Sequence, residues 1–379
     1  MTLTLRSVLV VAALISALGG FMFPIEIGGA DTDRVMIWQH GALLVFVGLA
    51  VLTAMAAISD RLRGPLLLAA LFLVAHFGAY ALISSLGDEA GKRGPGFWSL
   101  VIAAWALAWL LADRVAAIES RDRLKQRLLA IAIPALFGMW ILILWEIIVR
   151  GFDIPAVLLP PPSAIGARIA TSVPTLWADF QQTILKAVLI GYILGCGAGL
   201  VVAILIDRSS FLQRGLLPIG NLVSALPIVG VAPIMVMWFG FDWPSKAAVV
   251  IIMTFFPMLV NTVAGLASAS AMQRDLMKTY AASYWQTLFK LRLPEALPFI
   301  FNALKINSTL ALIGAIVAEF FGTPIVGMGF RISTEVGRMN IDMVWAEIAM
   351  AAVAGSLFYG AIALTERVFT FWHPSIRGS

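Results

Sequence analysis

The sequence is poor in charge, cysteine and histidine, and each shortage excludes a class of protein. Only 12% of its 379 residues are charged, about half the share found in soluble domains. The single Cys196 and three scattered histidines leave no disulfide framework and no metal-ligand cluster. No stretch fits the phosphate-binding pattern G-x-x-x-x-G-K-[ST], so this chain cannot hydrolyse ATP by a P-loop. We predict no catalytic residue, no metal site and no cofactor in the chain itself.

Hydrophobic residues make up 61% of the chain instead. They form long runs, and a run of about 20 apolar residues is enough to cross a bilayer as a helix. The sequence therefore predicts an all-α, polytopic integral membrane protein with about ten transmembrane helices. The predicted spans lie near residues 7–26, 36–57, 65–84, 97–113, 128–149, 181–206, 215–238, 247–268, 297–319 and 344–366.

The first apolar run has a second interpretation, because a signal peptide also joins a basic residue, here Arg6, to an apolar stretch. We prefer a span, because the run is long and no clear cleavage site follows it. With both termini in the cytoplasm, about two thirds of the loop lysines and arginines lie on the cytoplasmic side. The predicted location is a membrane, with both termini on its cytoplasmic side.

The sharpest change in composition divides the chain into two modules. Residues 113–127 carry a dense set of charges between apolar runs, which predicts a cytoplasmic linker. We predict a four-span accessory module over residues 1–112 and a six-span core over residues 128–379. A few polar residues lie in the first module, among them His40 and His76, without catalytic spacing.

The longest polar interruption of the core runs over residues 274–294. Its charged residues place it in water, yet it also carries apolar residues at helical spacing, with Leu276 before Tyr280 and Trp285 before Leu288 and Phe289. A loop that inserts an apolar knob into a second protein needs such a set. An interfacial helix lying on the bilayer is the alternative.

This segment resembles the cytoplasmic coupling loop of the membrane subunits of bacterial ATP-binding-cassette importers. Its signature is Glu-Ala-Ala, three residues, Gly, then nine residues to Ile-x-Leu-Pro, and residues 281–286 and 291–294 match the second half. The first half departs from the signature: residues 275–277 read Asp-Leu-Met, and Ala281 replaces the Gly. A turn at that position would need a positive φ, which Ala adopts poorly.

Two further segments, residues 225–240 and 255–262, are similar to the permeases for nitrate, taurine, alkanesulfonates, and pyrimidine or flavin precursors. The resemblance covers roughly residues 128–370 and implies a type I importer permease core. It also implies three partners: a separate ATPase that binds ATP and Mg, an outer solute-binding protein, and a second permease copy. The residues that the resemblance assigns to ATPase coupling are Asp275, Tyr280, Ala281, Ser283, Trp285, Leu288, Phe289 and Pro294.

Polar residues inside the spans indicate a solute pathway, because polar groups in hydrocarbon are costly. In the seventh span, two prolines six residues apart free backbone carbonyls, which are tolerated only against protein or a water-filled cavity. A kinked packing helix is the alternative. The predicted pathway residues are Asn221, Ser224, Pro227, Pro233, Asn261, Asn302, Lys305 and Ser308.

The predicted function is that of a permease subunit of an ATP-driven importer for a small polar solute. A pyrimidine precursor or riboflavin-like heterocycle is favoured over a sulfonate or nitrate, because Lys305 is the one cation available in the pathway. The alternative is a proton-coupled secondary transporter without an ATPase, in which Glu319 or Lys305 titrates; it would be expected to show inverted repeats and paired buried acids. A membrane-embedded enzyme lacks the necessary His or Asp cluster.

Overall fold

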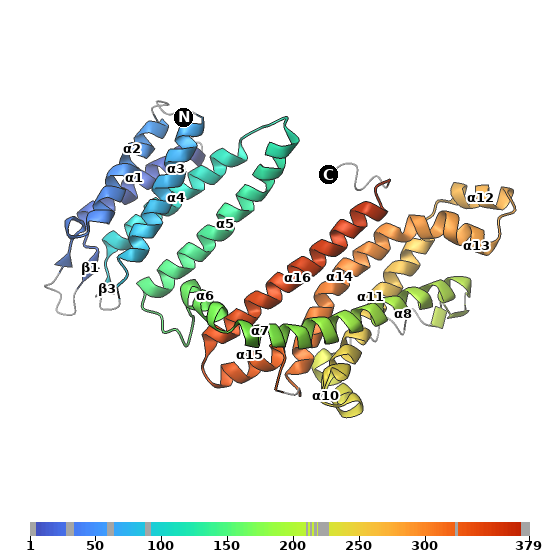
Figure 1. Cartoon of the computed structure of the whole chain (residues 1–379). Helices are drawn as coiled ribbons and strands as arrows, with labels where there is room; N and C mark the ends of the chain where they lie inside the picture. The colour runs from blue at the N-terminus through green and yellow to red at the C-terminus, as the bar shows by residue number, and fades with distance from the viewer. Residues whose placement is uncertain are drawn as a thin grey trace. The chain divides into compact units, whose positions relative to one another are not determined.

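The computed structural model is built almost entirely of helices (Figure 1). It describes residues 5–27, 34–58, 64–87, 92–209, 211–212, 214–215, 218, 227–322 and 325–372. The chain divides into two compact units, Met1–Ala164 and Ile165–Ser379. Each unit is described by itself below.

The first unit holds five long helices and a small sheet. The helices are α1 (Leu5–Met22), α2 (Gly41–Ile58), α3 (Pro65–Ser84), α4 (Pro95–Ala116) and α5 (Arg123–Gly151). The sheet joins the strands β1 (Glu26–Ile27), β2 (Arg34–Val35) and β3 (Lys92–Arg93) in the antiparallel order β2-β1-β3, and a short helix, η1 (Ile37–Gln39), follows β2.

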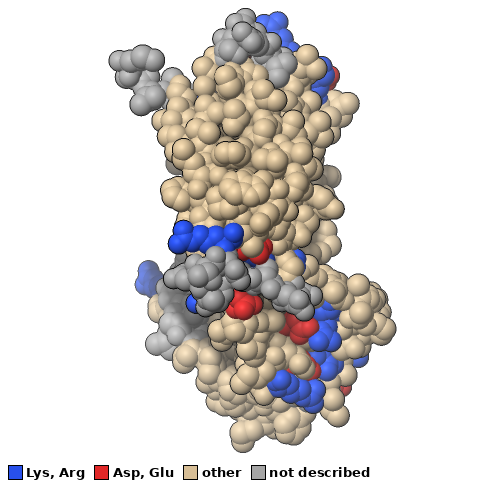
Figure 2. All heavy atoms as spheres, turned by 90° about the vertical axis from the view of Figure 1, so that its left-hand side faces the viewer, with Lys and Arg blue, Asp and Glu red and all other residues tan. Residues whose placement is uncertain are grey.

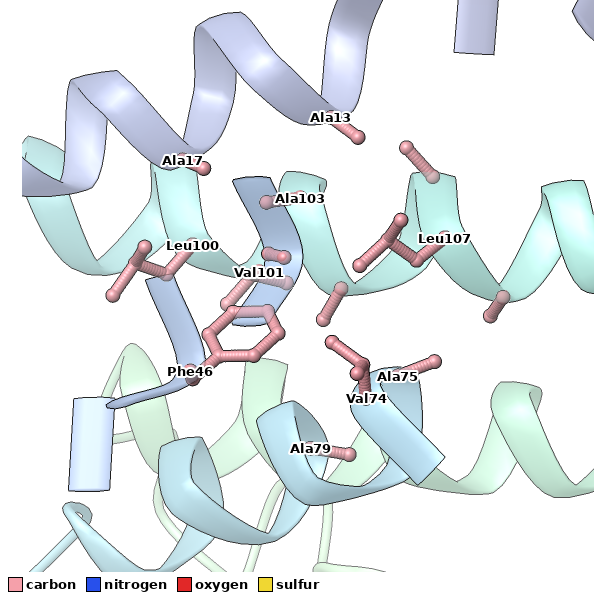
Figure 3. Close-up of a cluster of buried hydrophobic side chains, with 14 of the residues drawn as sticks. Ala13, Ala17, Phe46, Val74, Ala75, Ala79, Leu100, Val101, Ala103 and Leu107 are labelled. Atoms are coloured by element: carbon pink, nitrogen blue, oxygen red, sulfur yellow. The ribbon is translucent and has the colours of Figure 1, made fainter. Parts of the chain in front are cut away.

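Small residues let the first helices approach closely, as is usual for helices that pack in a membrane. Ala13 and Ala17 of α1 lie against α4, whose Leu100 and Leu107 are fully buried (Figure 3). Phe46 of α2 fills the space over Gly78 of α3, where a Cβ atom would lie 2.3 Å from the ring. At the end of this bundle, Arg6 of α1 pairs with Asp113 of α4, which shows that the two helices run antiparallel.

The second unit is built around one central helix, α11 (Trp243–Ala267), which packs against both α8 and α14. Its other elements are α6 (Pro162–Thr171, which begins at the end of the first unit), α7 (Val173–Phe180), the π-helical η2 (Gln181–Val188), α8 (Leu189–Arg208), α10 (Ile228–Phe239), α12 (Ala271–Thr279), α13 (Tyr284–Thr287), the π-helical η3 (Leu288–Arg292), α14 (Leu293–Glu319), α15 (Met328–Gly337) and α16 (Ile341–Phe369).

Three glycines explain how closely α8 meets α11. Gly191, Gly195 and Gly199 recur every four residues, so they share one face of α8. A Cβ atom at Gly195 would lie 2.1 Å from the Thr254 side chain, and one at Gly199 would lie 2.6 Å from a backbone oxygen of α11. Any larger residue on this stripe would push the two helices apart.

The spans agree with the sequence prediction over most of the chain. Within the described residues, nine helices are long and apolar enough to cross a membrane, and each corresponds to one predicted span. The tenth predicted span, 215–238, is described from Pro227 onward, where α10 forms a helix of 12 residues. Figure 2 shows a broad surface without a charged side chain, bordered by charged residues at both ends, as a bilayer-facing surface requires.

The predicted linker is a break between two helices. α4 ends at Ala116 and α5 begins at Arg123, where Asp122 caps it by accepting a hydrogen bond from Leu124 N. Contacts group α5 with the first unit, whereas the sequence analysis counted it with the permease core. The functional boundary near residues 113–127 stays a prediction.

Candidate functional site

The 274–294 loop folds as two short helices, each started by its own capping box. Ser270 accepts a hydrogen bond from Gln273 N, and the Gln273 side chain accepts one from Ser270 N. Ser283 and Gln286 repeat this exchange at the start of α13. Reciprocal caps of this kind satisfy amides that a helix start leaves free. The loop therefore has a defined shape without help from a partner.

The turn between α12 and α13 uses the conformation that the sequence makes difficult. Ala281 has φ +51°, in the left-handed region. Two hydrogen bonds hold it there: Ala281 N donates to Lys278 O at 2.9 Å, and Ala282 N donates to Met277 O at 3.0 Å. An L-residue in this region costs about 1–2 kcal/mol relative to the right-handed conformation. The turn of the family signature is thus kept, although Ala stands in place of Gly.

A bidentate ion pair fastens the loop to the transmembrane helices. Arg292 donates to both carboxylate oxygens of Asp207, at the end of α8, with distances of 2.6 and 2.7 Å. Its Nε donates to Leu266 O of α11 at 2.9 Å, and Tyr284 OH donates to Asp207 at 3.0 Å. Both charged side chains are largely buried, with 17% and 10% of their surface exposed. Asp207 was not among the predicted site residues; its only signal was an acid directly after an apolar run.

Five apolar side chains remain exposed on this fastened loop and on the start of α12 just before it. They are Met272 and Leu276 of α12 and Tyr280 at its C-terminal end, spaced four residues apart, and Trp285 and Phe289, spaced four apart after the turn. Trp285 stacks on Phe289 with ring centroids 6.0 Å apart, and the Arg208 guanidinium lies 5.8 Å from the Trp285 ring. A rigid aromatic group with a charged rim is the composition of an interface anchor.

Two predicted coupling residues have other roles. Leu288 was predicted to share the exposed face of Trp285, but it is fully buried in the core of the second unit. It begins the π-helical segment 288–292, which precedes Pro294, a residue without an amide hydrogen to donate. Asp275 lies near the start of the loop, where a carboxylate could cap the first helix, but Ser270 is the cap of α12, and Asp275 is an exposed mid-helix residue paired with Lys278 at 3.0 Å.

The predicted pathway residues are only partly described. Asn221 and Ser224 lie outside the described residues. Pro227 precedes α10 and Pro233 lies inside it. Asn261 donates to Pro257 O at 2.8 Å, one turn earlier in the same helix.

The remaining pathway residues lie on α14. Asn302 is exposed, and the buried Ser308 donates to Lys305 O at 2.7 Å. Lys305 pairs with Glu366 of α16 at 2.8 Å. In the described part of the chain, the side chains of Asn261, Asn302, Lys305 and Ser308 make no hydrogen bond to one another.

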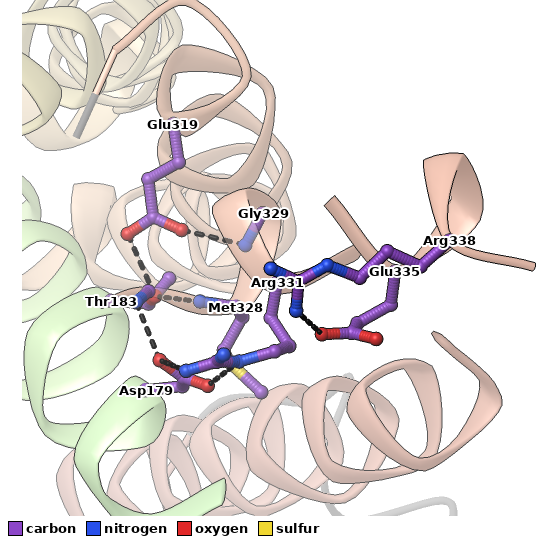
Figure 4. Close-up of polar contacts among 9 residues, drawn as sticks. Asp179, Thr183, Glu319, Met328, Gly329, Arg331, Glu335 and Arg338 are labelled. Atoms are coloured by element: carbon purple, nitrogen blue, oxygen red, sulfur yellow. Dashed lines mark hydrogen bonds and ion pairs between the residues drawn. The ribbon is translucent and has the colours of Figure 1, made fainter. Parts of the chain in front are cut away.

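A buried polar network at the other end of these helices was missed (Figure 4). Glu319 accepts hydrogen bonds from Thr183 at 2.8 Å and from Gly329 N at 2.7 Å. Asp179 accepts hydrogen bonds from Gly327 N at 2.6 Å and from Arg331 at 2.9 Å. Both acids therefore bind the first amides of α15, where free N–H groups favour negative charge. The sequence signal was present in Glu319 and the Gly-x-Gly at residues 327–329.

The sequence matches a family described as binding-protein-dependent transport system inner membrane components, over residues 191–377, and the chain belongs to this family of ABC transporter permeases. Relatives include the formylaminopyrimidine transport permease protein of Halalkalibacterium halodurans, 31% identical over 63% of this chain and 95% of the relative. The riboflavin transport system permease protein of Chloroflexus aurantiacus is 30% identical over 62% and 88%. The putative aliphatic sulfonates transport permease protein of Bacillus subtilis is 30% identical over 63% and 86%.

Membership confirms the predicted class: an all-α, multi-pass membrane protein that acts as a transport permease subunit. The family of binding-protein-dependent importers implies an ATPase and a solute-binding protein as partners. The relatives' names cover several solutes, so the shared fold does not distinguish among them. No relative mentioned above matches more than 63% of this chain.

Proposed function

We propose that this chain imports a small polar solute by docking a separate ATPase on the 274–294 loop. The observation that carries the proposal is the pairing of an exposed aromatic anchor, Trp285, with a buried bidentate ion pair, Arg292–Asp207, in the same loop. The anchor supplies an interface, and the ion pair makes the loop rigid enough to transmit force to α8 and α11. Two permease copies, two ATPases and an outer binding protein complete the proposed importer.

The proposed orientation puts the loop and both termini on the cytoplasmic side of a bacterial inner membrane. The distribution of Lys and Arg in the sequence supports it. The ion pair Arg6–Asp113 places the start of α1 and the end of α4 on one side, as an even number of spans from α1 to α4 requires. ATP and Mg would bind to the ATPase and not to this chain.

For the solute, we favour a neutral heterocycle such as a pyrimidine precursor or a riboflavin-like compound. The cation predicted for the pathway, Lys305, is paired with Glu366, so its charge is already balanced. An anionic sulfonate or nitrate would have to compete with that carboxylate. The names of two relatives agree with this preference, whereas the third relative is named for sulfonates.

The test is reconstitution with the ATPase and binding protein of the same transport system. We expect the ATPase to co-purify with the chain and ATP-dependent uptake of a formylaminopyrimidine or riboflavin into liposomes, with sulfonate and nitrate as comparison solutes. Uptake of sulfonate in preference to both heterocycles would overturn the solute assignment alone. Uptake driven by a proton gradient without any ATPase would overturn the importer mechanism.

A further inference from the structure

The α4–α5 hairpin of the first unit encloses two adjoining grooves. One, of about 670 Å³, lies between the end of α4, the connection and the start of α5, and has polar lining residues that include Ser120, Arg121 and Gln126. The other, of about 450 Å³, is mostly apolar, with Trp105, Trp109 and other aromatic residues in its wall. Ala116 and Ile133 line both grooves, so the polar groove passes into the apolar one.

The polar end of this site carries an excess of unpaired positive charge. Its five basic residues make no ion pair with any acid in the described part of the chain; they are Arg114, Arg121, Arg123, Lys125 and Arg127. Two of the three nearby acids are already engaged, since Asp113 pairs with Arg6 and Asp122 caps α5. The capping carboxylate of Asp122 keeps its charge, so Asp122 and Glu119 are left to oppose five cations. Arg114 adds a buried Nε atom with no hydrogen-bond partner among the described residues.

The apolar end is built for acyl chains. A third groove, of about 660 Å³, lies between α3, α4 and α5, has an almost wholly apolar lining, and shares Val115 with the polar groove. Unfilled apolar walls lose their dispersion contacts, so in a bilayer hydrocarbon fills such grooves. Trp109 lies one turn before Asp113, at the level where tryptophans mark a membrane interface. The polar groove then lies at headgroup depth and the two apolar grooves at acyl-chain depth.

We propose that the α4–α5 hairpin binds one anionic phospholipid. Its phosphate lies against the basic segment 119–127, and its two acyl chains occupy the apolar grooves on either side of α4. Basic pockets between transmembrane helices are suited to acidic headgroups. The bound lipid fills the space between α5 and its neighbours α3 and α4 and so holds α5 against these two helices. This site is separate from ATPase docking and from the solute pathway.

The test measures lipid binding by the full-length chain in a neutral detergent with native mass spectrometry. Phosphatidylglycerol is compared with phosphatidylcholine of the same acyl chains and with inorganic phosphate. The double variant Arg121→Gln, Arg123→Gln removes two exposed cations at the site. Each cation near a membrane surface contributes enough to change affinity about fivefold. We expect about 25-fold weaker binding of phosphatidylglycerol and unchanged binding of phosphatidylcholine.

The matched control, Arg274→Gln, Lys290→Gln, removes two exposed cations from the coupling loop and so lowers the net charge equally. This control should bind both lipids as tightly as the unchanged chain does. Ala116→Phe fills the passage between the grooves with the charges intact, and it should weaken the binding of both lipids. Unchanged unfolding midpoints in the same detergent show that the variants are folded.

Three results would overturn the proposal. An equal loss of affinity for phosphatidylglycerol in both double variants would show that the lipid is attracted diffusely to a basic protein. Binding of inorganic phosphate as tight as that of phosphatidylglycerol would show an anion site without a lipid groove. Normal lipid binding by folded Ala116→Phe would show that the acyl chains do not enter the grooves.

Discussion

Trp285 and Leu288 are three residues apart, yet their surroundings are opposite. Trp285 is 49% exposed and Leu288 is fully buried. The helical spacing of the sequence placed them on one face, but Leu288 packs into the hydrophobic core of the second unit. Trp285 is therefore available to contact a partner, while Leu288 contributes to the stability of the fold.

Trp285→Ala should weaken ATPase binding about thirty-fold. Truncating a central aromatic anchor typically costs about 2 kcal/mol or more at an interface, and 1.4 kcal/mol is about a factor of ten. The measurement is the affinity of the purified chain for its ATPase by titration. Trp177→Ala is the matched control, because Trp177 is also exposed but lies on α7, away from the loop. A loop that only lies on the bilayer would instead show normal ATPase affinity in Trp285→Ala.

Leu288→Ala should lower stability. Removing a fully buried leucine side chain costs about 2–5 kcal/mol, from lost burial and from the cavity left behind. The measurement is the unfolding midpoint in detergent, with Leu276→Ala, at an exposed position of the same loop, as the control. An unchanged midpoint in Leu288→Ala would contradict the buried position.

Asp207→Asn should loosen the loop, whereas Asp275→Asn should not. The amide leaves the Arg292 guanidinium largely buried and without its counter-charge, and breaking a buried pair costs about 3–5 kcal/mol. Asp275 and Lys278 are mostly exposed, and such pairs contribute about 0–1 kcal/mol. Hydrogen exchange over residues 284–292 should rise in Asp207→Asn only. Equal exchange in the two variants would show that the ion pair does not hold the loop.

At the scale of elements, α15 is held by its first turn. The backbone N–H groups of residues 327, 328 and 329 donate hydrogen bonds to Asp179 of α7, Thr183 of η2 and Glu319 of α14. Thr183 in turn donates to Glu319. Gly327 has φ +140°, and a Cβ atom there would lie 2.8 Å from the Glu319 carboxylate. The turn therefore requires glycine for both backbone and steric reasons.

Gly327→Ala should destabilise the protein and release α15 from this network. Holding a non-glycine residue in such a conformation costs about 1–3 kcal/mol, and the clash with Glu319 adds to it. The measurement is the unfolding midpoint together with hydrogen exchange of residues 328–337. Gly337→Ala is the control at the other end of the same helix, where a Cβ atom would meet nothing within 4 Å. Equal midpoints for the two variants would remove the argument for a required glycine.

At the scale of the whole molecule, the two units differ in their relation to the known family. The family match falls entirely within the second unit, as does every residue of the coupling loop. The first unit has its own core, in which α1–α4 bury a contiguous set of apolar side chains. This separation is the basis on which we propose an accessory role for residues 1–112.

Deleting residues 1–112 should leave a chain that still binds the ATPase, with a lower yield of purified protein. The coupling loop and the helices that fasten it are intact in the shortened chain. The measurement is ATPase affinity in detergent, and adding Trp285→Ala to the deletion should abolish most of that binding. A folded shortened chain that no longer binds the ATPase would make the first module part of the transport unit.

The sequence predicted what depends on local pattern. A run of apolar residues in a membrane forms a helix because backbone N–H and C=O groups must be hydrogen-bonded within the chain there. Nine spans were therefore predicted correctly within the described residues. The apolar spacing of the loop was also visible, since it acts within one or two turns, whereas the capping residues Ser270 and Ser283 were not recognised. The family signature at residues 281–294 identified the class for the same reason.

The substitution at Ala281 shows how a local rule can be overridden. Alanine disfavours a positive φ, and the sequence therefore put this turn in question. Hydrogen bonds to Lys278 and Met277 carbonyls hold it in place.

The amino-acid sequence by itself thus determined the class of protein and the number of spans within the described part, and it predicted the loop that would face a partner. Only the tertiary structure decided which polar residues meet. Asp207 and Arg292 are 85 residues apart in the chain, and Asp179 and Arg331 are 152 apart. Such pairs form because helix packing brings distant segments together, and the same packing buries Leu288 while Trp285, three residues earlier, stays exposed. No spacing along the chain encodes either effect.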